Sequence, residues 1–386
     1  MNALSYWEQE SFLDLADVVI IGCGITGLQA GIALKELAPS LKVTIVERGP
    51  LPSGASTRNA GFACFGSISE ILDDLESADP TTVFDLVERR WRGLQKLRSL
   101  VGDQRLRYQP LGGYEIFKKK DRALFEKCLA NVASFNEILA DITGEKNTYA
   151  PLDANKSGFG FRDVTHMIFN RMEGQLHPGE MMRALLGIAT EKDIPIFNGL
   201  DITEIHEASD KVDLIAANGW RFAGRKVLVT VNGFARRFFP NLDLRPARNQ
   251  VLITDPIDNL PFRGAFHYDK GYVYFRNVDV PGRPDQSRVL LGGFRNLAPE
   301  PETTEAFGTT ENIQNAMLTF LQETILPSRE VAINTWWSGI MGLGSSKRPL
   351  VEMTSQRIGM AVRLGGMGVA LGSLVGKEAA DMIFQK

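Results

Sequence analysis

The chain opens on a run of apolar positions that gives way to glycines and then to a helical pattern. Val18 to Ile21 is apolar at every position, as expected for a central parallel strand buried on both faces. A glycine-rich turn at 22–27 and an apolar helix pattern follow, and a second apolar run covers Lys42 to Val46. This order predicts the first βαβ unit of a Rossmann-like sheet.

Two longer helices are predicted beyond residue 78. In the first, Asp79 can cap the helix, Pro80 suits its first turn, and apolar residues from Val83 to Leu97 recur at helical spacing. The second covers residues 121–144. Between them, the sequence "RLRYQPLGGYEIFKKK" predicts a β-hairpin that turns at Gly112-Gly113.

The Rossmann-like pattern resumes after residue 176. A helix capped near His177 leads to a strand at 194–197, and a later strand, 227–231, ends in Asn232-Gly233, where the backbone can approach a cofactor closely. A late strand is followed by a glycine-rich turn at 365–368 and a final helix. The positive end of that helix is expected to point at whatever the turn holds.

Composition and charge narrow the class of protein. The 386 residues suffice for two domains, and 44% hydrophobic residues, 23% charged residues and a net charge of -3 are ordinary for a soluble protein. We expect no nucleic-acid partner, no membrane span and no secretory signal, and therefore a cytoplasmic protein. The three cysteines show no CxxC spacing, and the four histidines show no metal-ligand spacing, so neither a disulfide framework nor a metal site is expected.

The first glycine motif has the chemistry of a dinucleotide site. Gly22 permits the tight turn, Gly24 lets backbone approach a pyrophosphate, and Gly27 lets the helix lie close to the sheet. Glu47, at the end of the second strand, can hold ribose hydroxyls and disfavours a 2′-phosphate. These residues alone leave NAD and FAD undecided.

Two later segments favour FAD. Glu47 is followed by a polar loop of small residues, "RGPLPSGASTRNAGFACFGS", rather than by another βα unit, and a loop of about 20 residues is presumed functional. Its backbone donors and side chains can wrap a pyrophosphate. The helix after the turn at 365–368 would face the negative charge that a reduced flavin carries near N1, a need that a nicotinamide does not have.

With these motifs in place, the chain resembles the D-amino acid oxidase superfamily of FAD enzymes, which includes glycine and sarcosine oxidases. Within it, the chain is most similar to gamma-glutamylputrescine oxidase-like proteins. The matching segments extend nearly from end to end: "SYW" at Ser5, "GCGITG" at Gly22, "GASTRNAGF" at Gly54, "YFR" at Tyr274, "LLGGF" at Leu290, "WSGIMGLGSSKRP" at Trp337 and "GGMGVALGSLVGK" at Gly365.

The resemblance implies an α/β fold with an α+β substrate domain. A Rossmann-like FAD-binding domain would be built from the discontinuous segments 1–70, 166–242 and 332–386. An antiparallel-sheet substrate domain, from 71–165 and 243–331, would cover the flavin face.

The resemblance also implies how FAD is held. Sarcosine oxidase-like enzymes tether the flavin through a late cysteine, whereas the last cysteine here is Cys128, so noncovalent FAD is expected. The motifs and the resemblance together predict the cofactor-binding residues Gly22, Gly24, Ile25, Thr26, Gly27, Glu47, Arg48, Ala55, Ser56, Arg58, Asn59, Gly61, Ile202, Asn232, Gly233, Gly366, Met367, Gly368 and Val369.

Two departures from the family pattern bear on the substrate. Glycine oxidase-like members hold the substrate carboxylate with an arginine just after the tryptophan-glycine motif, where this chain has Met341. The gamma-glutamylputrescine oxidase-like group also lacks that arginine, and its substrates resemble amines more than amino acids. The group's usual glycine-histidine-glycine turn is here Gly366-Met367-Gly368.

The implied reaction is oxidation of a C–N bond in an amine or amino acid, with hydride transfer to flavin N5 and reoxidation by O2 or an electron carrier. The predicted catalytic residues are Tyr274, Arg276 and Trp337, and further candidates above the flavin ring are Tyr272, Phe275 and Trp336. Arg276 is expected either to hold a substrate carboxylate or to form a structural ion pair.

Two other functions stay open at this point. The same fold hosts FAD-dependent dehydrogenases of 2-hydroxy acids and enzymes that act on RNA-borne amines, although the near-neutral charge argues against RNA. The chain can also be a non-catalytic flavin-binding subunit whose partner carries out the chemistry.

Overall fold

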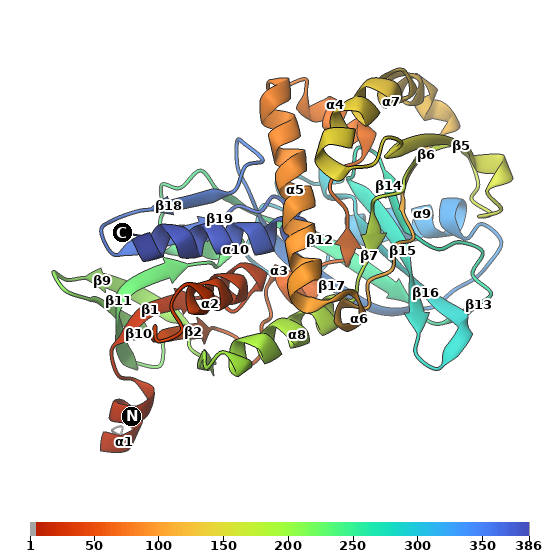
Figure 1. Ribbon diagram of the computed structural model, residues 1–386. Coiled ribbons are helices and arrows are strands. Elements are labelled where there is room, and N and C mark those ends of the chain that lie inside the picture. Colours follow the sequence, from red (N-terminus) through yellow and green to blue (C-terminus); the bar gives the residue numbers. More distant parts are fainter. Residues whose placement is uncertain (1–4, 386) are drawn as a thin grey trace.

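Residues 5–385 are described in the computed structural model, and they build two large β-sheets joined by helices (Figure 1). The predicted α/β fold with Rossmann-like and antiparallel parts is confirmed. The first four residues and the last residue of the predicted FAD-binding segments lie outside the described part. Within residues 5–385, none of the helices combines the length and the apolar character needed to cross a bilayer.

The first sheet is the Rossmann-like one. Its central strands run parallel in the order β19-β11-β1-β2-β8, and β18, β10 and β9 extend it by antiparallel pairing. The carboxyl ends of the central strands therefore meet at one edge, where such sheets bind ligands. The strands are β1 (Ala16–Ile21), β2 (Val43–Glu47), β8 (Ile196–Asn198), β9 (Ile202–Glu207), β10 (Val212–Ala216), β11 (Arg221–Val229), β18 (Leu350–Met353) and β19 (Ile358–Val362).

Several helices share a core with this sheet. α2 (Ile25–Leu37) and α10 (Gly368–Gln385) lie in front of it, α8 (Pro178–Glu191) lies beside α2, and α5 (Pro80–Val101) crosses α10 (Figure 1). The predicted caps are present. The Asp79 side chain accepts a hydrogen bond from the Thr82 N–H at 2.9 Å at the start of α5. The ring of His177 likewise accepts a hydrogen bond from a backbone N–H at the start of α8.

The second sheet is antiparallel except where β14 pairs with β4. Its core is aromatic, with Phe266 stacked on Phe275 at 4.8 Å between ring centroids. The strands are β4 (Gly113–Lys118), β5 (Tyr149–Asp153), β6 (Val164–Asn170), β12 (Arg245–Thr254), β13 (Ile257–Asp258), β14 (Ala265–Tyr268), β15 (Val273–Val280), β16 (Arg283–Gly293) and β17 (Ile333–Leu343).

The remaining elements complete the fold. The strands β3 (Phe62–Ala63) and β7 (Gly174–Gln175) pair with each other between the two large sheets. The remaining helices are α1 (Tyr6–Phe12), α3 (Ala55–Arg58), α4 (Ile68–Asp74), α6 (Asp103–Leu106), α7 (Arg122–Thr143) and α9 (Glu311–Phe320).

The structure corrects the predicted hairpin at Gly112-Gly113. Residues 108–112 form no strand of the second sheet, and β4 pairs instead with β6 on one side and β14 on the other. The predicted partner strand is missing because Gln109 instead forms an isolated β-bridge with Gln175 in β7.

Three elements cross the predicted domain limits. β17, inside the predicted FAD-binding segment 332–386, pairs with β12 in the second sheet, and most of β6 lies in a segment assigned to the FAD-binding domain. In contrast, α5 belongs to the predicted substrate domain but packs on α10 and enters the core of the first sheet. Apolar patterns alone do not show on which sheet such an element packs.

The crossing of α5 and α10 depends on Gly93. A Cβ at this position would lie 2.1 Å from the carbonyl oxygen of Ala370, so Gly93→Ala must push the helices apart. We expect this substitution to lower the free energy of unfolding by about 1–3 kcal/mol in urea denaturation. The matched control is Gly187→Ala in α8, where the new Cβ meets only Arg105 at 3.6 Å. An unchanged or raised stability of Gly93→Ala would contradict this packing.

Candidate functional site

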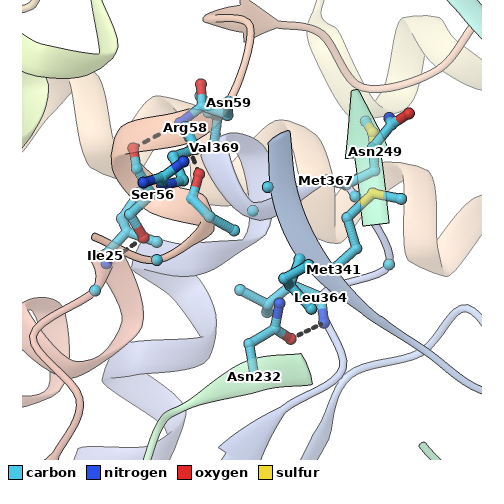
Figure 2. A pocket seen from close by; sticks show the side chains of 18 of the residues that line it. Ile25, Ser56, Arg58, Asn59, Asn232, Asn249, Met341, Leu364, Met367 and Val369 are labelled. Atoms are coloured by element: carbon cyan, nitrogen blue, oxygen red, sulfur yellow. Dashed lines mark hydrogen bonds between the residues drawn. The ribbon is translucent and has the colours of Figure 1, made fainter. Parts of the chain in front are cut away.

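A cavity of about 510 Å³ joins the two sheets. It begins at the carboxyl ends of β1 and β2, passes the loop that contains α3, and reaches the face of the second sheet. Figure 2 shows side chains from both regions converging on it, with Ile25 and Ser56 near one end and Asn249 and Met341 farther along. One continuous space therefore connects the predicted dinucleotide site with the predicted substrate domain.

The first glycine turn leaves the start of α2 open to the cavity. Gly22 has a φ of +106°, and Gly24 lies so close to Ser56 that a Cβ would be 3.0 Å from the Ser56 hydroxyl oxygen. That hydroxyl accepts a hydrogen bond from the Ile25 N–H at 2.9 Å. Gly27 does not line the cavity, because its Cα faces the carbonyl oxygen of Gly22.

Glu47 presents a fixed carboxylate at the end of β2. It is only 9% exposed, and its two oxygens accept hydrogen bonds from the backbone N–H groups of Cys23 and Gly49, each at 3.0 Å. The neighbouring Arg48 lies over the ring of Phe234 at 4.4 Å. All of the acid's immediate partners are backbone groups, so its orientation is set by the fold.

The loop at 53–61 is fastened by its own side chains. Arg58 donates hydrogen bonds to the carbonyl oxygens of Ser53 and Ser338, at 2.9 and 3.0 Å. Asn59 donates to the Ser56 carbonyl oxygen at 2.6 Å and accepts from the Gly61 N–H at 2.8 Å. Because these side chains hold the loop, backbone groups at the start of α3 face the cavity.

The opposite wall is the turn before α10. Gly365 and Gly366 have φ values of +58° and +81°, a conformation that favours glycine. Asn232 fastens the turn, since its side-chain oxygen accepts hydrogen bonds from the N–H of Arg363 at 3.0 Å and from the N–H of Leu364 at 3.2 Å. Figure 2 shows the second of these bonds. Gly233 faces away from the cavity, against the Met341 carbonyl oxygen.

These features fit a dinucleotide cofactor that spans the cavity. The N-termini of α2 and α10 both open onto it, and a helix N-terminus favours a negatively charged group. Apart from Gly27 and Gly233, every predicted cofactor-binding residue lines the cavity. Their contact with FAD stays a prediction.

The second sheet adds a mixed polar and apolar wall. Tyr274 is opposite His267 in the β14–β15 pairing, and both line the cavity together with Tyr272. The Tyr274 hydroxyl oxygen accepts a hydrogen bond from Asn249 at 3.1 Å, and burial raises the pKa of this tyrosine. Met341, where the sequence resemblance predicts a substrate-binding arginine to be replaced, contributes an apolar side chain to the wall of the same cavity (Figure 2).

Arg276 is not where the prediction requires it. It lies outside the cavity and donates hydrogen bonds to the carbonyl oxygens of Ala60, Leu176 and Asn277. Burial lowers its pKa to about 10. These contacts support neither predicted role, since Arg276 does not line the cavity and no acidic side chain of residues 5–385 forms an ion pair with it. It ties the loop after α3 to β15.

The aromatic candidates also divide. Trp337 does not line the cavity, because its ring N–H donates to the carbonyl oxygen of Arg58 at 2.9 Å and the ring packs beneath that loop. Phe275 is fully buried in the core of the second sheet, and Trp336 packs against the same core. Tyr272 and Tyr274 are therefore the aromatic candidates that reach the cavity.

Charged residues that sequence analysis missed gather at the substrate end. Glu70 and Asp74 pair with Lys347 at 3.4 and 2.6 Å, and Asp73 pairs with Lys270 at 2.5 Å. No short motif marks them, because they come from α4 and from two distant loops.

Arg295 differs from these paired cations. It lines the cavity, its guanidinium lies 5.9 Å from the ring centroid of Tyr272, and no acidic side chain within residues 5–385 forms an ion pair with it. The arginine directly follows the "LLGGF" segment, which was a signal available in the sequence. Among the charged side chains that the structure describes at this end of the cavity, Arg295 is therefore the one without an ion-pair partner.

Comparisons with known proteins agree with this geometry. A family model described as "FAD dependent oxidoreductase" matches residues 17–382. A search of curated proteins found no match. Similar solved structures include L-proline dehydrogenase from P. horikoshii (TM-score 0.75, 14% identity, covering 97% of this chain and 94% of that chain).

Two further structures have comparable similarity. Glycine oxidase from Geobacillus kaustophilus gives a TM-score of 0.73 at 18% identity, covering 96% of this chain and 95% of that chain. L-amino acid deaminase from Proteus vulgaris gives 0.74 at 17% identity, covering 100% and 95%. At these identities the likeness shows the fold.

Proposed function

Because the chain belongs to the FAD dependent oxidoreductase family, the superfamily of D-amino acid oxidase, we propose that it oxidises the C–N bond of an amino acid. The observation that carries the proposal is the continuous cavity, whose lining includes Arg295, an arginine with no acidic partner within residues 5–385. The similar glycine oxidase and amino acid deaminase structures support the same substrate class.

We propose that FAD is held noncovalently by the predicted residues that line the cavity. The start of α2 and the loop at 53–61 would hold the pyrophosphate, Glu47 a ribose, and the turn before α10 the flavin ring. Cys64 also lines the cavity, but burial keeps the pKa of its thiol well above the ordinary value, so no thiolate is available to attack a flavin. Bound FAD would supply the hydride acceptor.

The protein's own contribution is to orient the substrate and exclude water. Arg295 would bind the substrate carboxylate, a planar anion that matches the guanidinium fork. Tyr272 and Tyr274 would then enclose the carbon that loses hydride, and Met341 keeps that region apolar. In this proposal the carboxylate is held from the turn after β16 instead of from β17.

Anaerobic mixing tests the function. Purified yellow protein is mixed with amino acids, their decarboxylated amines and the matching 2-hydroxy acids, and flavin bleaching is followed by absorbance. Bleaching by an amino acid supports the proposal. Bleaching by hydroxy acids alone would establish the dehydrogenase alternative, and no bleaching by any compound would favour a non-catalytic subunit.

The role of Arg295 predicts a change in KM. Arg295→Gln should raise KM for the bleaching amino acid by about 10²-fold, since one charge-assisted pair is lost, and Arg295→Lys should restore only part of the affinity. The decarboxylated amine should be unaffected. The control is Arg263→Gln, which removes an exposed arginine paired with Asp279 outside the cavity. Equal effects on amine and amino acid would contradict carboxylate binding.

A further inference from the structure

A buried carboxylic acid lies directly behind the substrate end of the cavity. Glu173, between β6 and β7, is 1% exposed, and no lysine or arginine of residues 5–385 forms an ion pair with it. One of its oxygens accepts hydrogen bonds from the N–H groups of Phe65 and Gly66 at 2.9 and 3.1 Å. The other lies against Gly113, where a Cβ would be only 2.0 Å away.

His267 connects this acid with the cavity. The residue lines the cavity and packs edge-on against Phe62, with 5.1 Å between ring centroids. Its Nε2 is buried, finds no hydrogen-bond partner among residues 5–385, and lies 3.8 Å from the second oxygen of Glu173. A buried ring nitrogen without a hydrogen bond is costly, and here it faces the carboxyl oxygen that accepts neither backbone N–H. A proton held by one member of the pair can therefore be taken up by the other.

We propose that His267 and Glu173 together accept the proton that the substrate ammonium group must lose before its C–N bond is oxidised. This inference rests on the proposed function. One N–H bond of the ammonium breaks, and its proton bonds to the imidazole. The imidazole passes the proton on its Nε2 to the carboxylate of Glu173. The electron pair stays on the substrate nitrogen, where oxidation of the C–N bond requires it.

The electrostatics give this pair a defined pH range. Burial raises the pKa of Glu173 to about 7 and lowers the pKa of His267 to about 4. Above pH 7 the pair is a carboxylate beside a neutral imidazole, which has room for one proton. Below pH 7 the carboxyl already holds that proton. The pair therefore becomes able to accept a proton as pH rises through about 7. Because the two groups are coupled, this pKa describes the pair and not one residue.

The groups around the pair fit this role. The titratable or charged side chains that face it are Glu70 from α4, Cys64 after β3, Tyr108 before β4, and Tyr149 from β5. The nearby carboxylate of Glu70 raises the pKa of both members. It therefore favours uptake of a proton by the pair.

A metal ion is the competing occupant. Ligand atoms of Cys64, Glu173 and His267 lie within 4.8 Å of one another. However, the Cys64 thiol donates to the carbonyl oxygen of Gly174 at 3.7 Å, and one oxygen of Glu173 is already bound by two N–H groups. A metal would need a thiolate and free carboxylate oxygens. The contacts favour a proton.

The test compares flavin reduction in the FAD-loaded protein from pH 6 to 9, with the amino acid that bleaches the wild type. Glu173→Gln and His267→Gln should each slow reduction by about 10²-fold at pH 8. Their rates should rise about tenfold per pH unit, because only substrate that is already deprotonated reacts. The wild-type rate should instead level off above pH 7.

Matched controls separate this effect from a general loss of packing. Glu115→Gln removes another buried glutamate whose pKa burial raises to about 7, and His166→Gln removes a histidine stacked on Phe125. Neither residue lines the cavity, and both variants should keep the wild-type pH profile. A wild-type profile in Glu173→Gln or His267→Gln would overturn the proposal.

Two readouts do not depend on turnover. Infrared titration of the FAD-loaded protein should show protonated buried carboxyl groups that ionise near pH 7, with part of this signal missing in Glu173→Gln. Nitrogen NMR of the four histidines should show one ring, absent in His267→Gln, that stays neutral down to pH about 4. The proposal would be overturned if the wild type showed no carboxyl signal near pH 7. It would also be overturned if the wild type held one metal ion per chain and Glu173→Gln held none.

The failure of the proposed function is distinguishable from the failure of this inference. If no amino acid bleaches the wild type, both fail together. If the wild type is bleached but the two variants match it at every pH, only the proton-accepting role fails.

Discussion

Gly27→Ala is expected to yield protein that has lost its yellow flavin. A Cβ at residue 27 would lie 2.0 Å from the carbonyl oxygen of Gly22 and 2.7 Å from the Thr230 hydroxyl oxygen. The hydroxyl of Thr230 also donates to the carbonyl oxygens of Ile21 and Gly22, so the turn has little freedom to move. Either α2 or the turn must shift by about 1 Å, and we expect FAD affinity to fall by about 10²-fold or more.

Gly31→Ala is the matched control for this prediction. Gly31 lies one turn further along α2, where a new Cβ would meet the side-chain methyl groups of three isoleucines at 3.3–3.5 Å. This variant should keep the flavin, and alanine suits a helix interior better than glycine. FAD affinity is measured by titrating the apoprotein and following flavin fluorescence. Wild-type affinity in Gly27→Ala would show that close approach of α2 to the turn is not needed.

Arg90→Gln is expected to be the most destabilising charge substitution. Arg90 is 2% exposed, lies 3.4 Å from Glu70 as an ion pair, and donates to the carbonyl oxygen of Phe65 at 3.2 Å. Burial acts to raise the pKa of Glu70, but the charges of Arg90 and Lys347 outweigh it and hold that pKa below its ordinary value. Removing Arg90 leaves the Glu70 carboxylate, whose side chain is only 17% exposed, with Lys347 alone, and should lower the free energy of unfolding by about 3 kcal/mol in urea denaturation.

The pH dependence of this loss follows from the lowered pKa. A carboxyl with a lowered pKa in the folded state stabilises the protein above its ordinary pKa, and that contribution disappears as pH falls through the folded value. The difference between Arg90→Gln and the wild type should therefore be largest at neutral pH and shrink in acid.

The neighbouring arginine supplies the control. Arg89→Gln removes a partly exposed ion pair with Glu378 and should cost less than about 1 kcal/mol. The double variant Arg90→Gln, Glu70→Gln should regain part of the lost stability. A loss in Arg90→Gln no larger than in Arg89→Gln would mean that the buried pair contributes little.

The cofactor half of the site was predictable because its signals are local. Gly22 to Glu47 span 26 residues of one βαβ unit, so the order of turn, helix and acid fixes their relative positions. The match of the family model confirms the predicted superfamily. The narrower likeness to gamma-glutamylputrescine oxidase-like proteins stays a prediction.

The substrate half was not predictable in the same way. Arg276 shares a strand face with Tyr274, and the sequence predicts both to face the substrate. In the structure, the arginine donates hydrogen bonds to the carbonyl oxygens of Ala60 and Leu176, which are 216 and 100 residues away in the chain. His267 and Glu173 meet only through the pairing of β14, β4 and β6. Such contacts between residues far apart in the chain cannot be predicted from the periodicity of its apolar positions.

The order of the strands also has a consequence for protein synthesis. The first sheet pairs β11 with β1 and with β19, and the turn before α10 closes the cavity that the opening glycines begin. A ribosome makes the opening motif first and this turn more than 300 residues later. Tight cofactor binding must therefore wait until residues 358–385 have left the exit tunnel, and a nascent chain halted before them would hold an unfinished site.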